Sequence, residues 1–483
     1  MPTKQIKKAT PKKKSLPTKR LNNKQASSTT IESKKLATKK PRTRQEKPVQ
    51  KKQASSITIE SKKSATKKPR TRQEKPVQKK PVFKDEIDSF VSHIESLSKA
   101  LGPTMQAMGD SCKKTTEEMD SFIKKRSVQR TTEDGTEAFE IKPADFHQFS
   151  KKIKKITSAS LAVFNIPPIF LCALVHKYDA YLGRLLRVAF SVKPDILASS
   201  QKTLTYTDLA SFGSLEAARD SLIEKEVESV LRDSHSDHFK WMEERFALPL
   251  RKGLKIWPQF VEITERRNLF VHCDGIVSTQ YLRVCRQHGV ELDKNIKVGD
   301  QLHVTPDYFS KTSDCFLEIG IKLGHVLWRK LQPDDMAEAD DALHSTGFDL
   351  LSEERYDLAK IILLFSTDTL KNVSSDQIRR VNLINLCIAH KFSGDEKKCQ
   401  ETLDSEDWSS CSPELRMAVA VLKDKFDHAS SLMESMGAKG PVNREDYSTW
   451  PLFKFFRESK EFLETYRKLF GEKFILTEEN LPT

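Results

Sequence analysis

The sequence predicts an all-α protein: a helical bundle followed by helical-hairpin repeats, with a disordered basic tail before them. Apolar residues recur at helical spacing from Val82 onward, and beyond Asp334 the predicted helices become shorter and come in pairs. Residues 1–80 hold 27 Lys and Arg against 4 Asp and Glu; the whole chain holds 82 and 67, which leaves 55 and 63 for residues 81–483. The basic balance therefore belongs to the tail. The expected domains are the tail (1–81), satellite helices or a linker (82–154), the bundle (155–333) and a helical array (334–483).

The tail contains a tandem repeat of 28 residues. Gln25–Lys52 recurs as Gln53–Lys80, with only Thr29/Ile57 and Leu36/Ser64 different. So many like charges with so few large apolar residues cannot offset the entropy of ordering, so we expect disorder. The composition resembles linker-histone tails, and such segments bind phosphate backbones, of RNA or of DNA, without base selectivity. The alternative is an extension that only adds solubility. The candidate nucleic-acid-binding residues are Lys39, Lys40, Arg42, Arg44, Lys67, Lys68, Arg70 and Arg72.

Residues 82–333 show a series of helix signals. "EIDSFVSHIESLSKAL" and "EEMDSFIKKR" predict satellite helices before the Gly-containing "TTEDGTEAF". A long core helix is expected to begin at Asn165, because prolines follow directly inside its first turn. A second is expected after Ser214 as N-cap, and a third from Asp237. The fourth runs from Trp257, and the fifth from Ser313 to Leu331, after the short and extended "KNIKVGDQLHV". Together these helices describe a bundle.

Beyond Asp334 the pattern indicates helix pairs joined by compact turns. Such turns are expected at Ser393–Asp395 and at Asp424–Lys425. The pairs resemble tetratricopeptide-type hairpins, with an irregular period. The aromatic residues of the last helical region are expected to form core as the cap of the array: Trp450, Phe453, Phe456, Phe462, Tyr466 and Phe470.

Composition excludes several classes of protein. The eight cysteines are scattered without CxxC or paired Cys/His spacing, which argues against a zinc site and for a reduced chain. The most apolar run, Leu161–Val175, is interrupted by Pro167–Pro168 and is shorter than the about 20 residues that span a bilayer. No apolar segment follows the basic N-terminus, so no secretory signal is predicted. We expect a cytoplasmic protein without cofactor, metal or membrane association.

The stretch "TERRNLFVHCDG", residues 264–275, places polar residues in an apolar helix pattern. At about 100° per residue, Arg267 lies in the middle of a stripe formed by Phe260, Ile263, Phe270 and Val271. An unpaired guanidinium there is costly, so an anion must meet it. On the adjoining stripe lie Asn268, His272 and Glu265.

Two interpretations of Arg267 remain open at this level. In one, Arg267 pairs with an acid on a neighbouring helix, such as Asp179 or Glu226, and His272 is an ordinary histidine at a helix end. In the other, the anion is a ligand. His176 is a further candidate, although a core or rim histidine is the simpler interpretation. Cys273 has no assigned base, so it is interpreted as a packing residue.

The segment "ERRNLFVH" resembles the motif of HEPN domains, a superfamily of helical bundles. The motif consists of an arginine, a polar residue directly after it, and a histidine five positions after the arginine. The wider phrase from Trp257 to Cys285 is similar to the motif helix of large bacterial HEPN proteins grouped with RNase toxins and abortive-infection systems. The resemblance covers residues 155–332. It implies a metal-independent endoribonuclease, often a homodimer in which two motifs face each other across a cleft.

Carried onto this chain, the motif positions are Arg267, Asn268 and His272, with Glu265 only adjacent. The residue types suit RNA cleavage, because RNA contains its own nucleophile, the 2′-OH. A histidine exchanges protons near neutral pH, and an arginine stabilises the charge that develops on the phosphate. Asn268 is suited to orient the phosphate or the imidazole.

These observations lead to three hypotheses of function. The first is an RNA-cleaving toxin or anti-phage effector, whose C-terminal array binds a regulatory protein and whose tail adds affinity for nucleic acid. The second is a non-catalytic HEPN-like module that binds RNA, a nucleotide or a protein. The third is a nucleic-acid-binding protein that acts through its tail.

Overall fold

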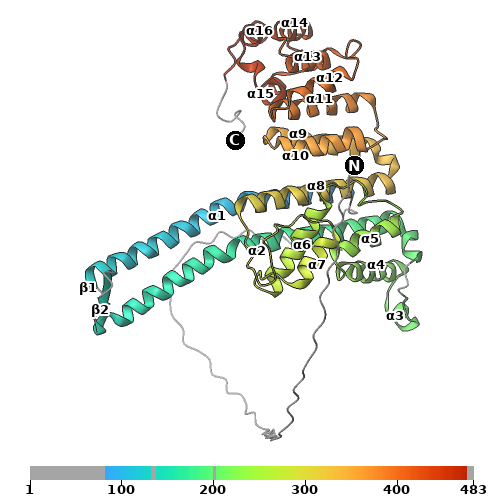
Figure 1. The fold of residues 1–483 in the computed structure, drawn as a ribbon. Coiled ribbons are helices and arrows are strands. Elements are labelled where there is room, and N and C mark those ends of the chain that lie inside the picture. Colours follow the sequence, from blue (N-terminus) through green and yellow to red (C-terminus); the bar gives the residue numbers. More distant parts are fainter. Residues whose placement is uncertain (1–81, 132–136, 200–202, 476–483) are drawn as a thin grey trace, which may run out of the picture. The chain divides into compact units, whose positions relative to one another are not determined.

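The structure is a computed structural model that describes residues 82–131, 137–199 and 203–475. The tail and its candidate binding residues lie outside the described residues. The described chain is predominantly helical, which confirms the all-α class (Figure 1). In chain order the elements are α1 Phe83–Arg126, β1 Ser127–Thr131, β2 Glu137–Ile141, α2 Phe146–Val192, α3 Tyr206–Ser211, α4 Leu215–Leu231, α5 His235–Phe246, α6 Trp257–His272, α7 Thr279–Gln287, α8 Pro306–Leu331, α9 Met336–Ser352, α10 Tyr356–Leu364, α11 Asp376–Phe392, α12 Glu396–Asp404, α13 Pro413–Leu422, α14 Phe426–Met436, α15 Arg444–Thr449 and α16 Lys460–Phe470.

The first helix belongs to the core, which corrects the expectation of satellite helices in residues 82–154. Figure 1 shows α1 and α2 side by side, joined by the β1–β2 hairpin. The strands pair antiparallel, from Ser127 opposite Ile141 to Thr131 opposite Glu137. The buried apolar residues Phe83, Ile87, Phe90 and Ile94 of α1 recur every three or four positions and pack in the same core as α2 and α8. The expected domain boundary after residue 154 falls inside α2.

The expected helix start at Asn165 is wrong. α2 begins at Phe146 and continues through Pro167 and Pro168. These prolines have no N–H for the carbonyls of Val163 and Phe164, a loss that normally ends or kinks a helix. Packing of Ile166 against the core helps to hold the helix together across this point. The start signal was sound locally, and tertiary contacts overrode it.

Helices α2, α4, α5, α6 and α8 surround a shared core, as the sequence predicts for a bundle. The ring of Tyr178 meets those of Phe260 and Phe316, at centroid distances of 5.1 and 5.6 Å. Ser214 is the N-cap of α4, as expected, and α6 begins at Trp257, as expected. Helix α8 begins at Pro306 rather than Ser313, after Thr305 as N-cap, and α7 was not foreseen.

Two glycines of α8 let α1 and α2 approach closely. A Cβ on Gly320 would clash with the ring of Phe90, and a Cβ on Gly324 would clash with Tyr181 and Ile87. The hydroxyl of Tyr181 donates a hydrogen bond to the carbonyl of Gly320 at 2.8 Å. The close approach of Phe90 and Ile87 to these glycines accounts for the burial of α1 against α8.

Replacing Gly320 with alanine is expected to lower the free energy of unfolding by about 1–3 kcal/mol, because the added methyl group overpacks the core against Phe90. The matched control is Gly109→Ala in α1, where nothing lies within 4 Å of the added Cβ, so helix propensity should leave stability equal or higher. Denaturant unfolding of both variants measures the difference. Equal stability of the two would contradict the close packing of α8 on α1.

The C-terminal part consists of α9–α16. The two predicted turns are confirmed: Ser393–Asp395 joins α11 to α12, and Asp424–Lys425 joins α13 to α14. The aromatic residues of the last region form core, and Phe453, Phe456 and Phe462 are fully buried. A single π-helical segment, Phe365–Thr369, follows α10.

One helical segment, Pro143–Val192, is long and apolar enough to cross a membrane by length and composition alone. Only 17% of its most apolar 18-residue stretch is buried. Its exposed side chains include Leu161, Phe164 and Ile169. The absence of membrane association stays a prediction, and α2 presents an apolar surface to its surroundings.

Candidate functional site

Helix α6 ends directly after the motif. The amides of Cys273 and Gly275 both donate to the carbonyl of Leu269, at 2.8 and 3.0 Å, and Gly275 has a positive φ of 80°. A Cβ on Gly275 would clash with Phe270, so glycine is required by space as well as by conformation. His272 is therefore the last residue of the helix.

Arg267 meets an acid of the bundle. Its Nη2 lies 3.3 Å from Oδ2 of Asp179 on α2, with 24% of the arginine side chain and 31% of the aspartate side chain exposed. The ion pair matches one of the two partners that the sequence suggested, while the other, Glu226, pairs with Arg245 at 2.9 Å. Within the described residues, the buried Nε of Arg267 has no hydrogen-bond partner. The guanidinium thus carries a buried, unsatisfied N–H beside its ion pair with Asp179.

The apolar stripe around Arg267 is incomplete. Phe260 and Ile263 are buried, but Val271 is 53% exposed. The expectation that Arg267 lies in the middle of a buried stripe is correct only toward the start of α6. The last turn of the helix leaves the core, because the chain reverses at Gly275 before another element covers that face.

The second oxygen of Asp179 binds a histidine that the sequence did not single out. His235 Nε2 lies 2.8 Å from Asp179 Oδ1, and only 8% of the His235 side chain is exposed. His235 is the first residue of α5, where Ser234 caps the helix by accepting from the amide of Asp237. The available signal was the Ser-His-Ser-Asp capping sequence, which places an imidazole at a helix start. Its acidic partner lies 56 positions earlier, so only the fold could reveal the pair.

Glu265 and Asn268 complete this group. The amide of Asn268 donates to Glu265 Oε1 at 3.4 Å. Burial raises the pKa of the Glu265 carboxyl, and the nearby charges of His235 and Arg267 oppose that rise. Glu265, which the sequence placed only next to the motif, therefore lies within electrostatic range of both His235 and Arg267. We call Asp179, His235, Glu265, Arg267 and Asn268 the α6 cluster.

His272 lies apart from the α6 cluster. At about 100° per residue it lies on the same stripe as Asn268 and Glu265, one turn beyond Asn268 at the exposed end of α6. Its side chain is exposed, and within the described part of the chain it has no hydrogen-bond partner. His176 is also exposed, so it is not a core histidine. The structure thus brings together Arg267, Asn268 and Glu265 but not His272.

The neighbouring arginine has a structural role. Arg266 Nε lies 2.7 Å from Oε1 of the buried Glu262, which also accepts from the hydroxyl groups of Tyr281 and Tyr308, each at 2.6 Å. The guanidinium also lies 4.0 Å from the ring centroid of Tyr308. This network fastens α6 to α7 and α8. Of the two adjacent arginines, Arg266 stabilises the fold, and Arg267 faces the α6 cluster.

Acid is expected to destabilise the bundle through buried histidines. Burial lowers the pKa of His238 to about 4, and burial together with the charge of Arg329 lowers that of His325 to about 3. Because the unfolded chain binds these protons near the ordinary pKa of 6.5, stability is full above that value and falls as pH drops toward the folded pKa. Each of the two histidines should lower the free energy of unfolding by about 2 kcal/mol as the pH falls from about 7 to 5.

Unfolding measured across that pH range tests this expectation. His238→Gln should reduce the loss, whereas the exposed His147→Ala should leave it unchanged. Stability that is independent of pH in this range would show that burial does not lower the pKa of these two rings.

Residues 82–131, 137–199 and 203–475 contain no group of three or more His, Cys, Asp or Glu side chains placed to hold a metal ion. The eight cysteines are free. Comparison of the chain with protein-family models, curated proteins and solved structures found no match. The α6 cluster is therefore interpreted from its own geometry and from the motif in residues 264–275.

Proposed function

We propose that the protein is a metal-independent endoribonuclease whose site is built around Arg267. The observation that carries this proposal is the α6 cluster, in which a guanidinium, a carboxylate and an imidazole from three helices meet at a partly exposed position. Such groups are more typical of sites than of surfaces, because their charges must be brought together against desolvation. The HEPN resemblance of the motif supports the same reaction.

The residues suit cleavage by the RNA's own 2′-OH. A base takes the proton of that hydroxyl, its oxygen attacks phosphorus, and an acid protonates the departing 5′-oxygen. Arg267 stabilises the negative charge on the phosphate in the transition state through its partly exposed guanidinium. His235, oriented by Asp179, and His272, exposed at the end of α6, are the two groups suited to move protons. Asn268 orients the phosphate.

A second copy of the chain would supply the missing neighbour of His272. Exposed apolar residues of α2, among them Phe164, continue onto the loop after α6. The Phe164 ring meets that of His303 in the segment between α7 and α8, and the preceding residue, Leu302, donates its amide to the carbonyl of Gly275 just after α6. Val271 and Ile276, at the end of α6 and just after it, are exposed as well. We propose that this surface forms a homodimer in which His272 of one copy approaches the α6 cluster of the other.

Replacing Ile169 with glutamate is expected to convert the dimer to monomer and to lower RNA cleavage by at least about tenfold, because 61% of this side chain is exposed on α2. Light scattering after size exclusion measures the mass. Leu215→Glu, at an exposed apolar position of α4, is the matched control and should leave the mass unchanged. A wild-type protein that is monomeric and still cleaves RNA would contradict the proposed dimer, while the proposed nuclease activity would stand.

The direct test of the nuclease is incubation of the full chain with cellular RNA in EDTA, followed by analysis of the new ends. The proposal requires fragments with 2′,3′-cyclic phosphate or its hydrolysis products. Intact RNA, at protein concentrations that saturate binding, would reject it. As further proposals, the protein acts in the cytoplasm as a toxin or anti-phage effector, and a regulatory protein binds α9–α16.

The ion pair itself favours a second candidate, a non-catalytic HEPN-like module. Asp179 already neutralises Arg267, as expected for a structural arginine. In that case Arg267→Ala lowers stability, and RNA or a nucleotide binds without being cleaved.

Deletion of residues 1–81 distinguishes the nuclease from the hypothesis that the tail is the functional part. A nuclease keeps its cleavage activity and loses only salt-sensitive affinity for nucleic acid, whereas a tail-based binder loses its function.

A further inference from the structure

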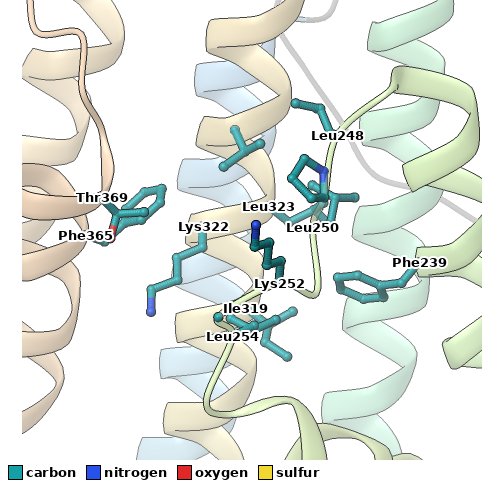
Figure 2. Close-up of a pocket in the computed structure, with 13 residues that line it drawn as sticks. Phe239, Leu248, Leu250, Lys252, Leu254, Ile319, Lys322, Leu323, Phe365 and Thr369 are labelled. Carbon is teal, nitrogen blue, oxygen red and sulfur yellow. The ribbon is translucent and has the colours of Figure 1, made fainter.

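A cavity lies between the loop that joins α5 to α6, the middle of α8 and the π-helical segment Phe365–Thr369 (Figure 2). Its volume is about 240 Å³. The apolar walls include Phe239, Leu250, Leu254, Ile319, Leu323 and Phe365. Phe239, Ile319, Leu323 and Phe365 are buried, so the floor of the cavity is part of the core.

Two lysines and no acidic residue line this cavity. In Figure 2, Lys252 comes from the loop and Lys322 from α8, between Phe239 on one side and Phe365 on the other. Lys322 pairs with Glu318 one turn earlier in α8, at 2.5 Å, and its ammonium lies 5.9 Å from the Phe365 ring centroid. Within the described chain, the ammonium of Lys252 has no ion-pair partner. The cavity thus combines an apolar interior with two lysines, of which Lys322 is paired with Glu318 and Lys252 has no ion-pair partner within the described chain.

The loop over the cavity is held in place by specific contacts. Ala247 has a positive φ of 52°, and Glu243 accepts from the amide of Arg251 at 2.7 Å and from its Nε at 2.9 Å. On the opposite side, the π-helical turn supplies Phe365 and Thr369. Single π-helical turns within or next to α-helices occur frequently at functional sites. The cavity is therefore preformed, as ligand sites usually are.

We propose that this cavity binds an amphipathic monoanion, an alkyl carboxylate of about eight carbons. The carboxylate pairs with Lys252 and Lys322, and the chain fills the space among Phe239, Leu323 and Phe365. The size follows from the volume, since 240 Å³ corresponds to about eight water molecules at their share of about 30 Å³ in the liquid. An apolar tail gains by leaving water, and an anionic head compensates the unpaired Lys252 and lies beside Lys322. This site is separate from the α6 cluster and does not depend on its proposed function.

Calorimetric titration of the full chain with sodium octanoate tests the site. Octanoate is expected to bind and to raise the melting temperature in proportion to the logarithm of its concentration. Butanoate should bind at least about tenfold more weakly, because it leaves most of the apolar wall unfilled. Heptyltrimethylammonium, with the same seven-carbon tail and the opposite charge, should show a similar loss of at least about tenfold.

Lys252→Met and Lys322→Met are each expected to weaken octanoate binding at least about tenfold, because methionine keeps much of the apolar stem and removes the charge. Lys255→Met is the matched control, since Lys255 is exposed on the same loop but does not line the cavity. Lys252 is exposed and makes no ion pair, so its variant should melt like the wild type. Absence of binding at millimolar octanoate, or equal binding by both lysine variants and the wild type, would overturn the proposal.

Discussion

Arg267→Ala and His272→Ala are each expected to lower the rate of RNA cleavage in EDTA by at least about 100-fold. Arginine removal withdraws the cation that faces the phosphate, and loss of one stabilising donor typically costs about 100-fold or more. Histidine removal withdraws a group suited to proton transfer, an effect of about 100-fold to 10 000-fold. His235→Ala is expected to show a loss of the same size if Asp179 orients it for catalysis. Single-turnover cleavage of a defined RNA measures all three.

The controls separate chemistry from folding. Arg286→Ala and His147→Ala remove exposed side chains of the same types outside the α6 cluster and should retain full activity. Each variant must melt like the wild type before its rate is compared. Arg267→Ala leaves Asp179 only with His235, so a drop in melting temperature without any cleavage by the wild type would favour the non-catalytic module. Full activity of His272→Ala would assign proton transfer to His235 alone.

Glu262→Ala is expected to lower the free energy of unfolding by about 3–5 kcal/mol, the largest effect on stability that we predict. Glu262 is buried and bonded to Arg266, Tyr281 and Tyr308. Its removal leaves the charge of Arg266 uncompensated in the core, which is the costly way to break a buried ion pair. Denaturant unfolding followed by circular dichroism measures the loss.

A graded series tests the same network. Tyr281→Phe and Tyr308→Phe each remove one hydrogen bond to Glu262 and keep its pairing with Arg266, so each should cost about 1–3 kcal/mol. Exposed Glu291→Ala is the control for loss of a carboxylate and should change stability by less than about 0.5 kcal/mol. A Glu262→Ala variant no less stable than Tyr281→Phe would show that Arg266 does not depend on Glu262.

Local signals predicted the elements well where caps and turns agree with packing. Ser214 and Trp257 mark the starts of α4 and α6, and the turn at Ser393–Asp395 lies where expected. The prediction was wrong at Asn165, where the proline pair has the pattern of a helix start. Helix α2 nevertheless continues through these prolines, with Ile166 and Phe170 packed against the core on either side of them.

The sequence likewise predicted some parts of the candidate site and missed others. Helix periodicity identified Arg267 as a cation on an apolar face, and the sequence left both Asp179 and Glu226 open as acids that could meet it. It did not single out His235, because the Asp179–His235 pair joins two helices 56 residues apart. Nor did it reveal the structural role of Arg266, since that role depends on the buried Glu262 and the two tyrosines around it.

By itself, the sequence determined that the chain is helical, where its basic charge lies and which helix carries the polar motif, because composition and periodicity are local properties. Only the tertiary structure decided which charges meet. It joined α1 to the bundle through the glycines of α8, placed Asp179 between Arg267 and His235, and turned His272 away toward solvent. The physical reason is that a buried charge is tolerated only beside a partner, and partners far apart in the chain are selected by packing.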